Sequence, residues 1–346
     1  HARFTGPGAV EVNNQVLTSD KIFINVGGRA FIPPGFENVD YLTNESIMDI
    51  DFVPEHLIIV GGRYIGLEFG QMYRRFGSQV TIVEMSDRLL TREDPEVSEE
   101  IKRILELEGI NIRLNAKCLE GHQHGETVTV QVDCDEGDKQ ISGSHLLIAT
   151  GRTPNTGDLG LEKAGIETDH RGYIKVDEQL QSNVPGVWAL GDVNGKGAFT
   201  HTAYNDFEIV AANLLDNDQR KVSDRITVYA LYTDPALARI GMNLTQAKQS
   251  GRNVLVGFRK MDRIARAKEK GETHGFMQIL IDADSELILG ATILGIEGDE
   301  IIHSLLDIMY TGQSYKVIQK AVHIHPTVSE LIPTILGELK PLEITG

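Results

Sequence analysis

The sequence predicts an α/β protein with a separate α+β domain at its C-terminal end. Residues 56–84 follow the order strand, glycine turn, helix and strand, which is a βαβ unit. Two apolar segments far apart in the chain, residues 21–26 and 145–150, both lead into glycine and arginine, with a proline close behind. After residue 220, the predicted strands are joined by hairpin connections, which is typical of an antiparallel sheet.

The βαβ unit has the spacing of a dinucleotide-binding motif. Residues 56–60 form a short apolar strand that stops at Gly61 and Gly62, and helical apolar spacing then continues up to Gly77. The start of such a helix offers free N–H groups and a positive dipole end to a pyrophosphate. Glu84 ends the second strand roughly 20 residues on, where a carboxylate accepts hydrogen bonds from a ribose diol. We therefore predict that a dinucleotide binds here.

One position departs from the G-x-G-x-x-G pattern of this motif. Gly61 and Gly66 supply the first and third glycine, but Arg63 stands where the middle glycine is usual. The Arg63 side chain fits if it turns outward, and it can also pair with a phosphate. Weakened binding is another outcome, and a βαβ unit that serves only for packing is the alternative interpretation of the whole segment.

Composition narrows the classes of partner. The chain has 346 residues, enough for two or three domains, and a net charge of −17, which argues against nucleic acid and anionic membranes. No apolar run approaches the length of a membrane span. Cys118 and Cys134 are far from a C-x-x-C spacing, so a cytoplasmic location is expected.

His122 and His124 are expected in a solvated polar loop rather than at a metal. Because His1 falls within a predicted hairpin, we expect an N-terminal part to be missing.

The repeated strand–glycine–arginine–proline pattern predicts two related nucleotide-binding domains, the first present only as its tail. The alternative is a chance similarity between two short strands. The predicted boundaries are 1–46 for this tail, 47–151 for the first complete domain, 152–220 for a return segment and 221–346 for the α+β domain.

The return segment carries a second candidate site. An apolar strand ends at Gly191 and Asp192, and a helix begins near Thr200 and His201. A carboxylate at a strand end can bind a polyol hydroxyl, and the helix N-terminus behind it can stabilise a developing anion. The alternative is that Asp192 only forms a turn.

The segment HIHPTVSE, residues 323–330, has competing interpretations. Thr327 and Glu330 have the spacing of a capping box, which needs no function. His323 and His325 alternate like strand residues and could chelate a metal, but no third ligand is apparent. A histidine held next to a carboxylate is also the usual composition of a general base.

Four motifs in order, GGRYIGLE, ATGRTPN, VWALGD and HIHPTVSE, resemble those of the pyridine nucleotide-disulfide oxidoreductases, in particular dihydrolipoamide dehydrogenase and mercuric reductase. The resemblance covers essentially the whole chain. It implies a Rossmann-like NAD-binding domain (47–151) within a split FAD-binding domain (1–46 and 152–220), followed by a dimerisation domain (221–346). The flavin-binding strand–glycine–helix motif and the redox-active C-x-x-x-x-C with which such enzymes begin are not in this sequence.

The resemblance also implies roles for residues of the NAD-binding domain. Tyr64 resembles the tyrosine that covers the nicotinamide pocket and moves when the cofactor enters, and Glu68 resembles the glutamate that meets the carboxamide. Glu84 stands where NAD-preferring members have an acid, although the nearby Arg88 leaves NADP possible. The cofactor-binding residues implied in full are Gly61, Gly62, Arg63, Tyr64, Ile65, Gly66, Glu68, Glu84, Gly151, Asp192, Thr200 and His201.

In the remaining domains, Asp192 resembles the aspartate bound to the flavin ribityl chain, and the backbone near Thr200 and His201 would face the flavin pyrimidine edge. His325 resembles the catalytic base that serves the dithiol of the other subunit, with Glu330 as its orienter. The resemblance further implies that the His325–Pro326 bond is cis, a form that only proline makes accessible.

The implied function is that of a homodimer which passes electrons from NAD(P)H through FAD to a redox disulfide, and then to a small-molecule disulfide or another acceptor. The chain alone is expected to be inactive and colourless. The paired C-terminal cysteines of mercuric reductase are absent, which argues against mercury as the substrate. Two alternatives stay open: a flavin-dependent reductase without the disulfide, and a non-catalytic dimerisation or nucleotide-binding module.

Overall fold

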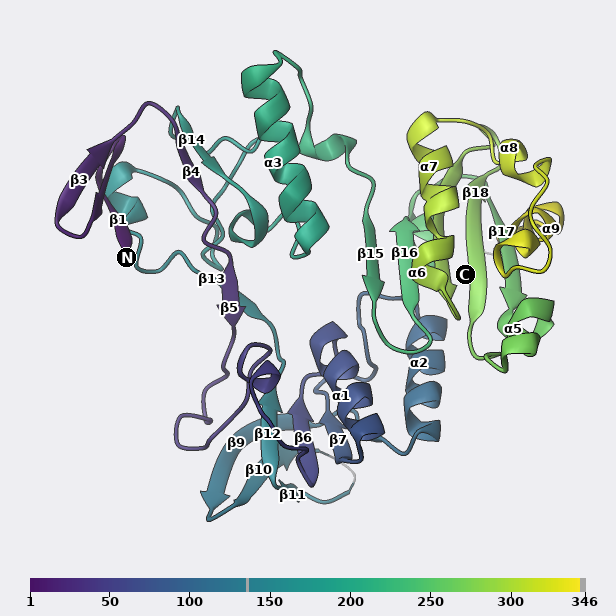
Figure 1. The fold of residues 1–346 in the computed structure, drawn as a ribbon, viewed down its shortest axis with the longest axis horizontal. Helices are drawn as coiled ribbons and strands as arrows, with labels where there is room; N and C mark the ends of the chain where they lie inside the picture. The colour runs from purple at the N-terminus through teal and green to yellow at the C-terminus, as the bar shows by residue number, and fades with distance from the viewer. Residues whose placement is uncertain (135–136, 343–346) are drawn as a thin grey trace. The chain divides into compact units, whose positions relative to one another are not determined.

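The computed structural model describes residues 1–134 and 137–342 (Figure 1). The chain divides into two compact units, His1–Phe31 with Gly151–Arg225, and Ile32–Thr150 with Ile226–Gly346. Each unit therefore joins an early part of the chain to a later one, as a split domain requires. The second unit contains both the βαβ segment and the C-terminal sheet.

The first unit begins with a three-stranded antiparallel meander, whereas the sequence predicted a simple hairpin. The extra turn is made by Asn13 and Asn14, with φ of 51° and 61°, a pair of left-handed residues that suits a tight hairpin. Two further strand pairs and one long helix complete the unit. Its elements are β1 (Ala2–Gly6), β2 (Ala9–Val12), β3 (Gln15–Thr18), β4 (Ile22–Ile24) parallel to β14 (Val187–Ala189), β5 (Gly28–Ala30) antiparallel to β13 (Arg152–Pro154), η2 (Leu161–Ala164), η3 (Gly191–Asn194), α3 (Thr200–Leu215) and η4 (Val222–Asp224).

The βαβ part of the second unit is a parallel sheet in the order β12-β6-β7-β8. One face packs against helix α1, and the other face, with Ile58 and Val60, packs against a three-stranded antiparallel sheet through Val128 and Val130. The elements are η1 (Ser46–Met48), β6 (His56–Val60), α1 (Tyr64–Phe76), β7 (Gln79–Val83), α2 (Pro95–Leu107), β8 (Asn111–Arg113), β9 (Lys117–His124), β10 (Thr127–Asp133), β11 (Gln140–Gly143) and β12 (His145–Ile148).

The sequence signals of this part lie at the observed boundaries. Gly77 ends α1 with φ +112°, a left-handed conformation that glycine adopts without strain. Pro95 occupies the first turn of α2, where the missing N–H costs nothing. His122 and His124, however, lie within β9, where they pair with Thr129 and Thr127 of β10, so their placement in a loop was wrong.

The C-terminal part is a six-stranded antiparallel sheet in the order β15-β16-β19-β18-β17-β20. Leu231 and Leu237 of this sheet share one hydrophobic core with Leu57 and Leu67 of the βαβ part, which explains why the two parts form a single unit. The elements are β15 (Val228–Leu231), β16 (Leu237–Gly241), α4 (Leu244–Gln249), β17 (Val254–Lys260), η5 (Met261–Arg263), α5 (Ala265–Lys270), β18 (Phe276–Asp282), β19 (Ile288–Leu294), α6 (Gly298–Ile301), α7 (His303–Thr311), α8 (Lys316–Gln319), η6 (Ser329–Leu331), α9 (Ile332–Gly337) and β20 (Lys340–Pro341).

Two features of this part differ from the sequence prediction. Strand β16 was missed, although it lies inside the sheet between β15 and β19. His323 and His325 alternate like strand residues in the sequence, but the backbone around them is irregular, with Val322 and Ile324 exposed to solvent. Within the described ranges, no helix is long and apolar enough to cross a membrane.

Candidate functional site

The turn between β6 and α1 needs glycine at two positions for steric reasons. Gly61 has φ +118°, and a Cβ added there would lie 2.4 Å from the carbonyl oxygen of Ala149. A Cβ added to Gly66 would lie 2.0 Å from the carbonyl oxygen of Gly61. Both distances are impossible for a real side chain, so the glycines allow the helix to start tightly against the turn.

Arg63 fits the turn although it replaces the usual middle glycine. It precedes α1 with φ −108° and ψ −173°, an extended conformation open to any residue, and its side chain is exposed. Within the described part of the chain, no side chain caps the N-terminus of α1. Arg63 therefore leaves the first turn of the helix available to an anion.

Glu84 is held beside this turn. Its carboxylate is buried, and its two oxygens accept hydrogen bonds from the backbone N–H of Gly62 at 2.7 Å and of Ser86 at 2.9 Å. Each oxygen keeps a further lone pair, which suits a ribose hydroxyl. The glycine turn, the uncapped helix and the fixed carboxylate together fit a dinucleotide.

Two other polar groups lie close in sequence or space to Glu84. Burial, together with the charge of Glu84, raises the pKa of the Cys118 thiol to about 12. Arg88 has a buried Nε without a hydrogen-bond partner among the residues that the structure describes, while its Nη2 lies 3.4 Å from the carbonyl oxygen of Thr91. The Nε–H of Arg88 is thus an unused donor.

The first residue of α1 is tied to the C-terminal sheet. The Tyr64 hydroxyl donates to Oε1 of Glu93 at 3.1 Å, and the Tyr229 hydroxyl of β15 donates to the same oxygen at 2.6 Å. Arg239 of β16 donates from Nη1 to Oε2 of Glu93 at 2.8 Å. Burial and the charge of Glu93 raise the pKa values of both tyrosines. The sequence analysis missed these partners because no local motif connects them.

Glu68 lies one turn after Tyr64 on α1 and makes a similar contact. Its Oε1 accepts a hydrogen bond from the backbone N–H of Tyr232 at 2.8 Å. Burial raises the pKa of Glu68 above its ordinary value, although this hydrogen bond opposes the shift. Ile65, between them, packs against the core of the unit.

In the first unit, Asp192 lies in η3 and is fixed from two sides. Its Oδ2 lies 3.3 Å from Nε of Arg152. The buried Asp206 of α3 accepts hydrogen bonds from the backbone N–H of Gly191 at 2.9 Å and from Asn194 Nδ2 at 2.8 Å, and it pairs with Arg225. Asp206 therefore holds the turn that carries Asp192.

Sequence reasoning overlooked Asp206, although a signal for it exists. Asp206 lies on the buried face of α3, together with Thr202, Ile209 and Val210. The helical spacing therefore predicts a carboxylate on a side of the helix that faces the core. A buried carboxylate needs partners, and these anchor the turn.

Helix α3 begins at Thr200, as the sequence predicted. Thr200 and His201 are both exposed in the first turn, and the backbone N–H of Phe199 donates to Thr202 Oγ1 at 3.2 Å. The His201 ring stacks on Phe199 with centroids 5.3 Å apart. Gly151, with φ +157°, accepts a hydrogen bond from the backbone N–H of Phe31 at 2.9 Å. A half-buried carboxylate at Asp192 and an exposed helix start fit a polyol and an anionic group.

His325 and Glu330 are in contact, and the His325–Pro326 bond is cis, as the sequence analysis expected. Nδ1 of His325 lies 2.9 Å and 3.1 Å from the two Glu330 oxygens, while the ring is 77% exposed. Thr327 Oγ1 accepts from the backbone N–H of Glu330 at 3.2 Å, so only this half of the capping box serves the helix. No metal-binding group of three His, Cys, Asp or Glu side chains occurs in residues 1–134 and 137–342.

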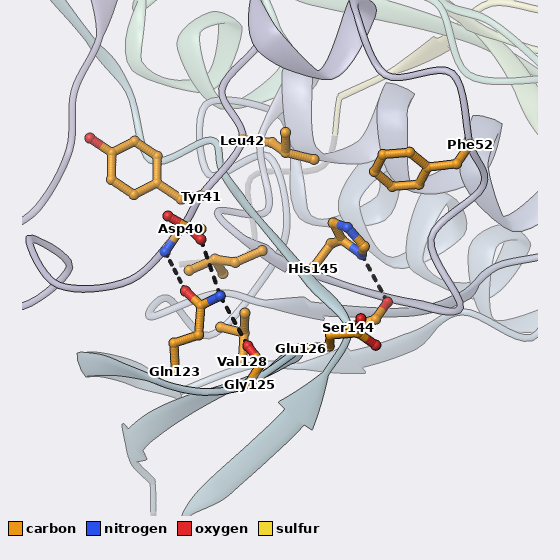
Figure 2. A pocket seen from close by; sticks show the side chains of 11 residues that line it. Asp40, Tyr41, Leu42, Phe52, Gln123, Gly125, Glu126, Val128, Ser144 and His145 are labelled. Atoms are coloured by element: carbon orange, nitrogen blue, oxygen red, sulfur yellow. Dashed lines mark hydrogen bonds between the residues drawn. The ribbon is translucent and has the colours of Figure 1, made fainter.

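A separate cavity of about 510 Å³ lies near the start of β12 (Figure 2). Asp40 and Gln123 are hydrogen-bonded to each other there: the backbone N–H of Asp40 donates to Gln123 Oε1 at 2.8 Å. His145 packs against Phe52 with ring centroids 4.9 Å apart, and burial lowers the pKa of His145. The lining contains two carboxylates and no lysine or arginine, so it does not suit a phosphate. No predicted site residue lines this cavity.

Comparison with known proteins decides the family. Residues 1–206 match the family described as pyridine nucleotide-disulphide oxidoreductase, and residues 227–335 match the dimerisation domain of the same family. The chain belongs to the pyridine nucleotide-disulfide oxidoreductase family. This family is FAD-dependent and uses NAD(P)H. The fold class, the enzyme class and the two cofactors expected from the sequence are thereby confirmed.

Curated relatives are similar along most of this chain. It is 34% identical over 331 residues to the probable pyridine nucleotide-disulfide oxidoreductase RclA of Escherichia coli, covering 94% of this chain and 74% of that protein. It is 32% identical to a mercuric reductase of Staphylococcus aureus, covering 88% of this chain but only 56% of the relative. It is 31% identical to a dihydrolipoyl dehydrogenase of Thermus scotoductus, covering 95% and 72%. The chain thus spans about half to three quarters of these relatives.

Among solved structures, the chain is similar to the HOCl-induced flavoprotein disulfide reductase RclA from Escherichia coli. The TM-score is 0.91 at 32% sequence identity, and the match covers 98% of this chain and 78% of that chain. The match to a dimerisation domain supports a homodimer.

Proposed function

We propose that this chain forms the NAD-binding, flavin-contacting and dimerisation parts of a disulfide reductase, with His325 as its catalytic base. The supporting observation is that His325 Nδ1 lies 2.9 Å from a carboxylate oxygen of Glu330. The His325 side chain is at the same time 77% exposed. A carboxylate on Nδ1 orients the imidazole, which leaves Nε2 to move a proton. Such a base is useful mainly where thiols must be deprotonated and protonated again.

The proposed domain assignment follows the sequence boundaries. Residues 1–46 and 152–220 would contact FAD through Asp192, Thr200 and His201, and Gly151, at the end of the 47–151 domain, would also lie at a cofactor. Residues 47–151 would bind NAD through the glycine turn, and residues 221–346, of which the last four lie outside the described part, would form the dimer. When bound, FAD and NAD(P)H supply the hydride and electron transfer of the reaction.

The chain's own residues would bind, orient and move protons. The first turn of α1 would hold the pyrophosphate, with Gly61, Gly62, Arg63, Tyr64, Ile65 and Gly66 around it. Glu84 would accept a hydrogen bond from a ribose hydroxyl, and Glu68 would meet the carboxamide. His325 would take a proton at Nε2 and return it, while Glu330 holds the ring in place at Nδ1.

The acceptor of the electrons is proposed to be a redox-active cysteine pair and then a small-molecule disulfide. Cys118 and Cys134 are both free, and they are 16 positions apart rather than five. The proposal therefore requires the cysteine pair to lie outside these 346 residues. Two free cysteines suit a reducing cytoplasm, which remains a prediction.

The His325–Glu330 proposal is tested in the intact protein loaded with FAD. Two NADH-driven reactions are compared: reduction of a disulfide such as lipoamide, and reduction of ferricyanide, which needs no dithiol. We expect His325→Asn to lower disulfide reduction at least about 100-fold and to leave ferricyanide reduction within about twofold. His323→Asn, a change in a half-buried ring two residues away, serves as the matched control.

Three results would separate the proposals. Loss of both reactions in His325→Asn would indicate a structural role for the histidine. Retention of both would favour a flavin-dependent reductase without the disulfide. Glu330→Gln should produce the same selective loss as His325→Asn, but a smaller one, because the ring loses its orienting charge and keeps its nitrogen.

The nucleotide preference is predicted from Glu84. A 2′-phosphate on NADPH would face this fixed carboxylate, so NADH should bind at least about tenfold tighter. Titration of both nucleotides by fluorescence measures the difference, and Glu84→Gln should reduce it. If NADPH binds tighter instead, and Arg88→Met removes that preference, then Arg88 rather than Glu84 selects the nucleotide.

A further inference from the structure

The cavity at the start of β12 has walls that are fixed by hydrogen bonds within the protein (Figure 2). The backbone of Leu42 is joined to β12, because its N–H donates to the Leu146 carbonyl oxygen at 2.7 Å and its own carbonyl oxygen accepts from the Ile148 N–H at 2.9 Å. The Gln123 side chain of β9 donates from Nε2 to Oδ2 of Asp40 at 3.1 Å. The cavity, about 510 Å³ in volume, is therefore already formed without a ligand, and it is in the size range of small-molecule sites.

Aromatic side chains line two sides of this cavity. Figure 2 shows Tyr41 on one side of the lining and Phe52 on the other, and the two residues are 37% and 47% exposed. Val128 and Leu146 add buried aliphatic surface to the lining. A ligand with a flat apolar body would cover this surface. The faces of aromatic rings also attract cations.

His145 contributes a hydrogen-bond acceptor to the lining. The hydroxyl oxygen of Ser144 lies 3.0 Å from the backbone N–H nitrogen of His56, 3.1 Å from the carbonyl oxygen of His56 and 3.0 Å from Nδ1 of His145. A hydroxyl has one hydrogen, so all three contacts are hydrogen bonds only when Ser144 donates to the carbonyl oxygen and Nδ1 of His145 donates to Ser144. Burial lowers the pKa of His145, so the ring is neutral at pH 7.5 and its Nε2 carries a lone pair.

The charged groups of the lining are carboxylates. Within the part of the chain that the structure describes, Asp40 Oδ1 accepts no hydrogen bond, and the Glu126 side chain, at the turn between β9 and β10, makes neither a hydrogen bond nor an ion pair. The described lining contains no lysine or arginine. A cation therefore meets two carboxylates without displacing a cation of the protein, whereas an anion is repelled.

We propose that this cavity binds a small organic cation, in which an ammonium group is attached to a flat aromatic body. The aromatic body would lie against Tyr41 and Phe52, and the ammonium group would donate to Oδ1 of Asp40. Nε2 of His145 would accept a further N–H of the ligand. The inference goes beyond the proposed function and does not depend on it, because no residue assigned to NAD, FAD or proton transfer lines the cavity.

Three indoles of similar shape test the proposal by isothermal titration calorimetry at pH 7.5, in the intact protein loaded with FAD. Tryptamine carries an ammonium group, tryptophol a neutral hydroxyl and indole-3-propionate a carboxylate. We expect tryptamine to bind with a dissociation constant of about 1 mM or tighter, and tryptophol to bind at least about fivefold more weakly. Indole-3-propionate should bind more weakly still, because its charge is repelled by the carboxylates.

Three variants locate the binding. Asp40→Asn keeps an oxygen for Gln123 and removes the charge, so tryptamine should bind at least about fivefold more weakly. Glu126→Gln should weaken binding by about two- to threefold, because this carboxylate is exposed. Glu45→Gln is the matched control: it removes the same charge from an exposed residue outside the lining, and it should leave the dissociation constant of tryptamine within about 1.5-fold.

Several results would overturn the proposal. Equal binding of tryptamine and tryptophol would show an apolar cavity without a preference for charge. Equal losses in Asp40→Asn and Glu45→Gln would show general attraction to a protein with a net charge of −17. Failure of tryptamine to bind at about 5 mM would also refute it. If Asp40→Asn does not fold, the comparison of Glu126→Gln with Glu45→Gln decides alone.

A titration with NADH separates this inference from the proposed function. The dissociation constant of NADH should stay within about twofold in Asp40→Asn and Glu126→Gln, because the cavity lies outside the proposed dinucleotide site. A wild-type protein that binds tryptamine but not NADH would refute the proposed dinucleotide site and leave this inference standing.

Discussion

Glu93 and Arg239 form a buried ion pair between residues 146 positions apart in the sequence. Removing one partner of such a pair is costly, because the other charge stays buried without compensation. Replacing both partners with apolar residues is often neutral, because two desolvation penalties disappear together. The Glu93–Arg239 pair therefore fixes the positions of its two side chains more than it stabilises the folded protein.

The first prediction follows from this asymmetry. Glu93→Leu should lower the free energy of unfolding by about 3–5 kcal/mol, and the double change Glu93→Leu with Arg239→Leu should recover most of that loss. Urea denaturation measures both values. As a control, Glu269→Gln breaks the exposed pair with Arg266 and should cost under about 1 kcal/mol. A double variant as unstable as the single one would contradict the explanation.

Cys118 gives a second prediction at the residue scale. Burial and the charge of Glu84 raise its pKa to about 12, so at pH 8 almost none of the thiol is the reactive thiolate. In the unfolded chain its pKa is about 8.5, and a substantial fraction reacts at the same pH. Iodoacetamide labelling followed by peptide mapping should show Cys118 protected until the protein unfolds. Equal labelling rates in folded and unfolded protein would show that the site is open.

At the scale of elements, the start of α1 depends on backbone geometry more than on the identity of residue 63. Gly61 and Gly66 are sterically required, whereas Arg63 has an extended backbone and an exposed side chain. This turn thus requires glycine at the first and third glycine positions of the G-x-G-x-x-G pattern, but not at the second.

This leads to a prediction for Arg63. Arg63→Gly should leave the dissociation constant of NADH unchanged within about threefold, or lower it, because the side chain is outside the turn. Arg63→Glu should weaken binding, because a carboxylate beside the helix start opposes the pyrophosphate. Fluorescence titration measures both. A loss of more than about tenfold in Arg63→Gly would instead identify Arg63 as a phosphate ligand.

Local signals account for the elements that the sequence predicted well. Gly61, Gly77 and Pro95 fix the boundaries of β6, α1 and α2, because each of them acts within one turn of chain. Strand β16 and the strand positions of His122 and His124 were missed, because their pairing with β19 and β10 is decided by partners elsewhere in the chain.

At the scale of the whole molecule, the His325 segment has a surface that suits a partner subunit. Val322 is 100% exposed and Ile324 79% exposed, on either side of His323. Large apolar side chains so exposed next to a candidate base are expected to be covered in a dimer. Residues 227–335, which contain both, match a dimerisation domain.

The corresponding prediction is that Ile324→Asp weakens the dimer. A charge buried at the interface costs several kcal/mol, so sedimentation equilibrium should show monomers at concentrations where the wild type is dimeric. Far-ultraviolet circular dichroism should stay unchanged, because the side chain makes few contacts within the subunit. Leu107→Asp, a change at another exposed apolar residue, is the control and should leave the dimer intact. A dimeric Ile324→Asp protein would exclude this segment from the interface.

The sequence alone determined the βαβ unit, the glycine turn with Glu84, the family and its cofactors, because these depend on motifs read over short stretches. It also predicted the His325–Glu330 contact, five residues apart. Only the tertiary structure brought Tyr64 to Glu93, Tyr229 and Arg239, and Asp206 to the turn of Asp192. Such clusters join buried polar groups from separate elements, and their pairing is decided by packing and desolvation rather than by any local pattern.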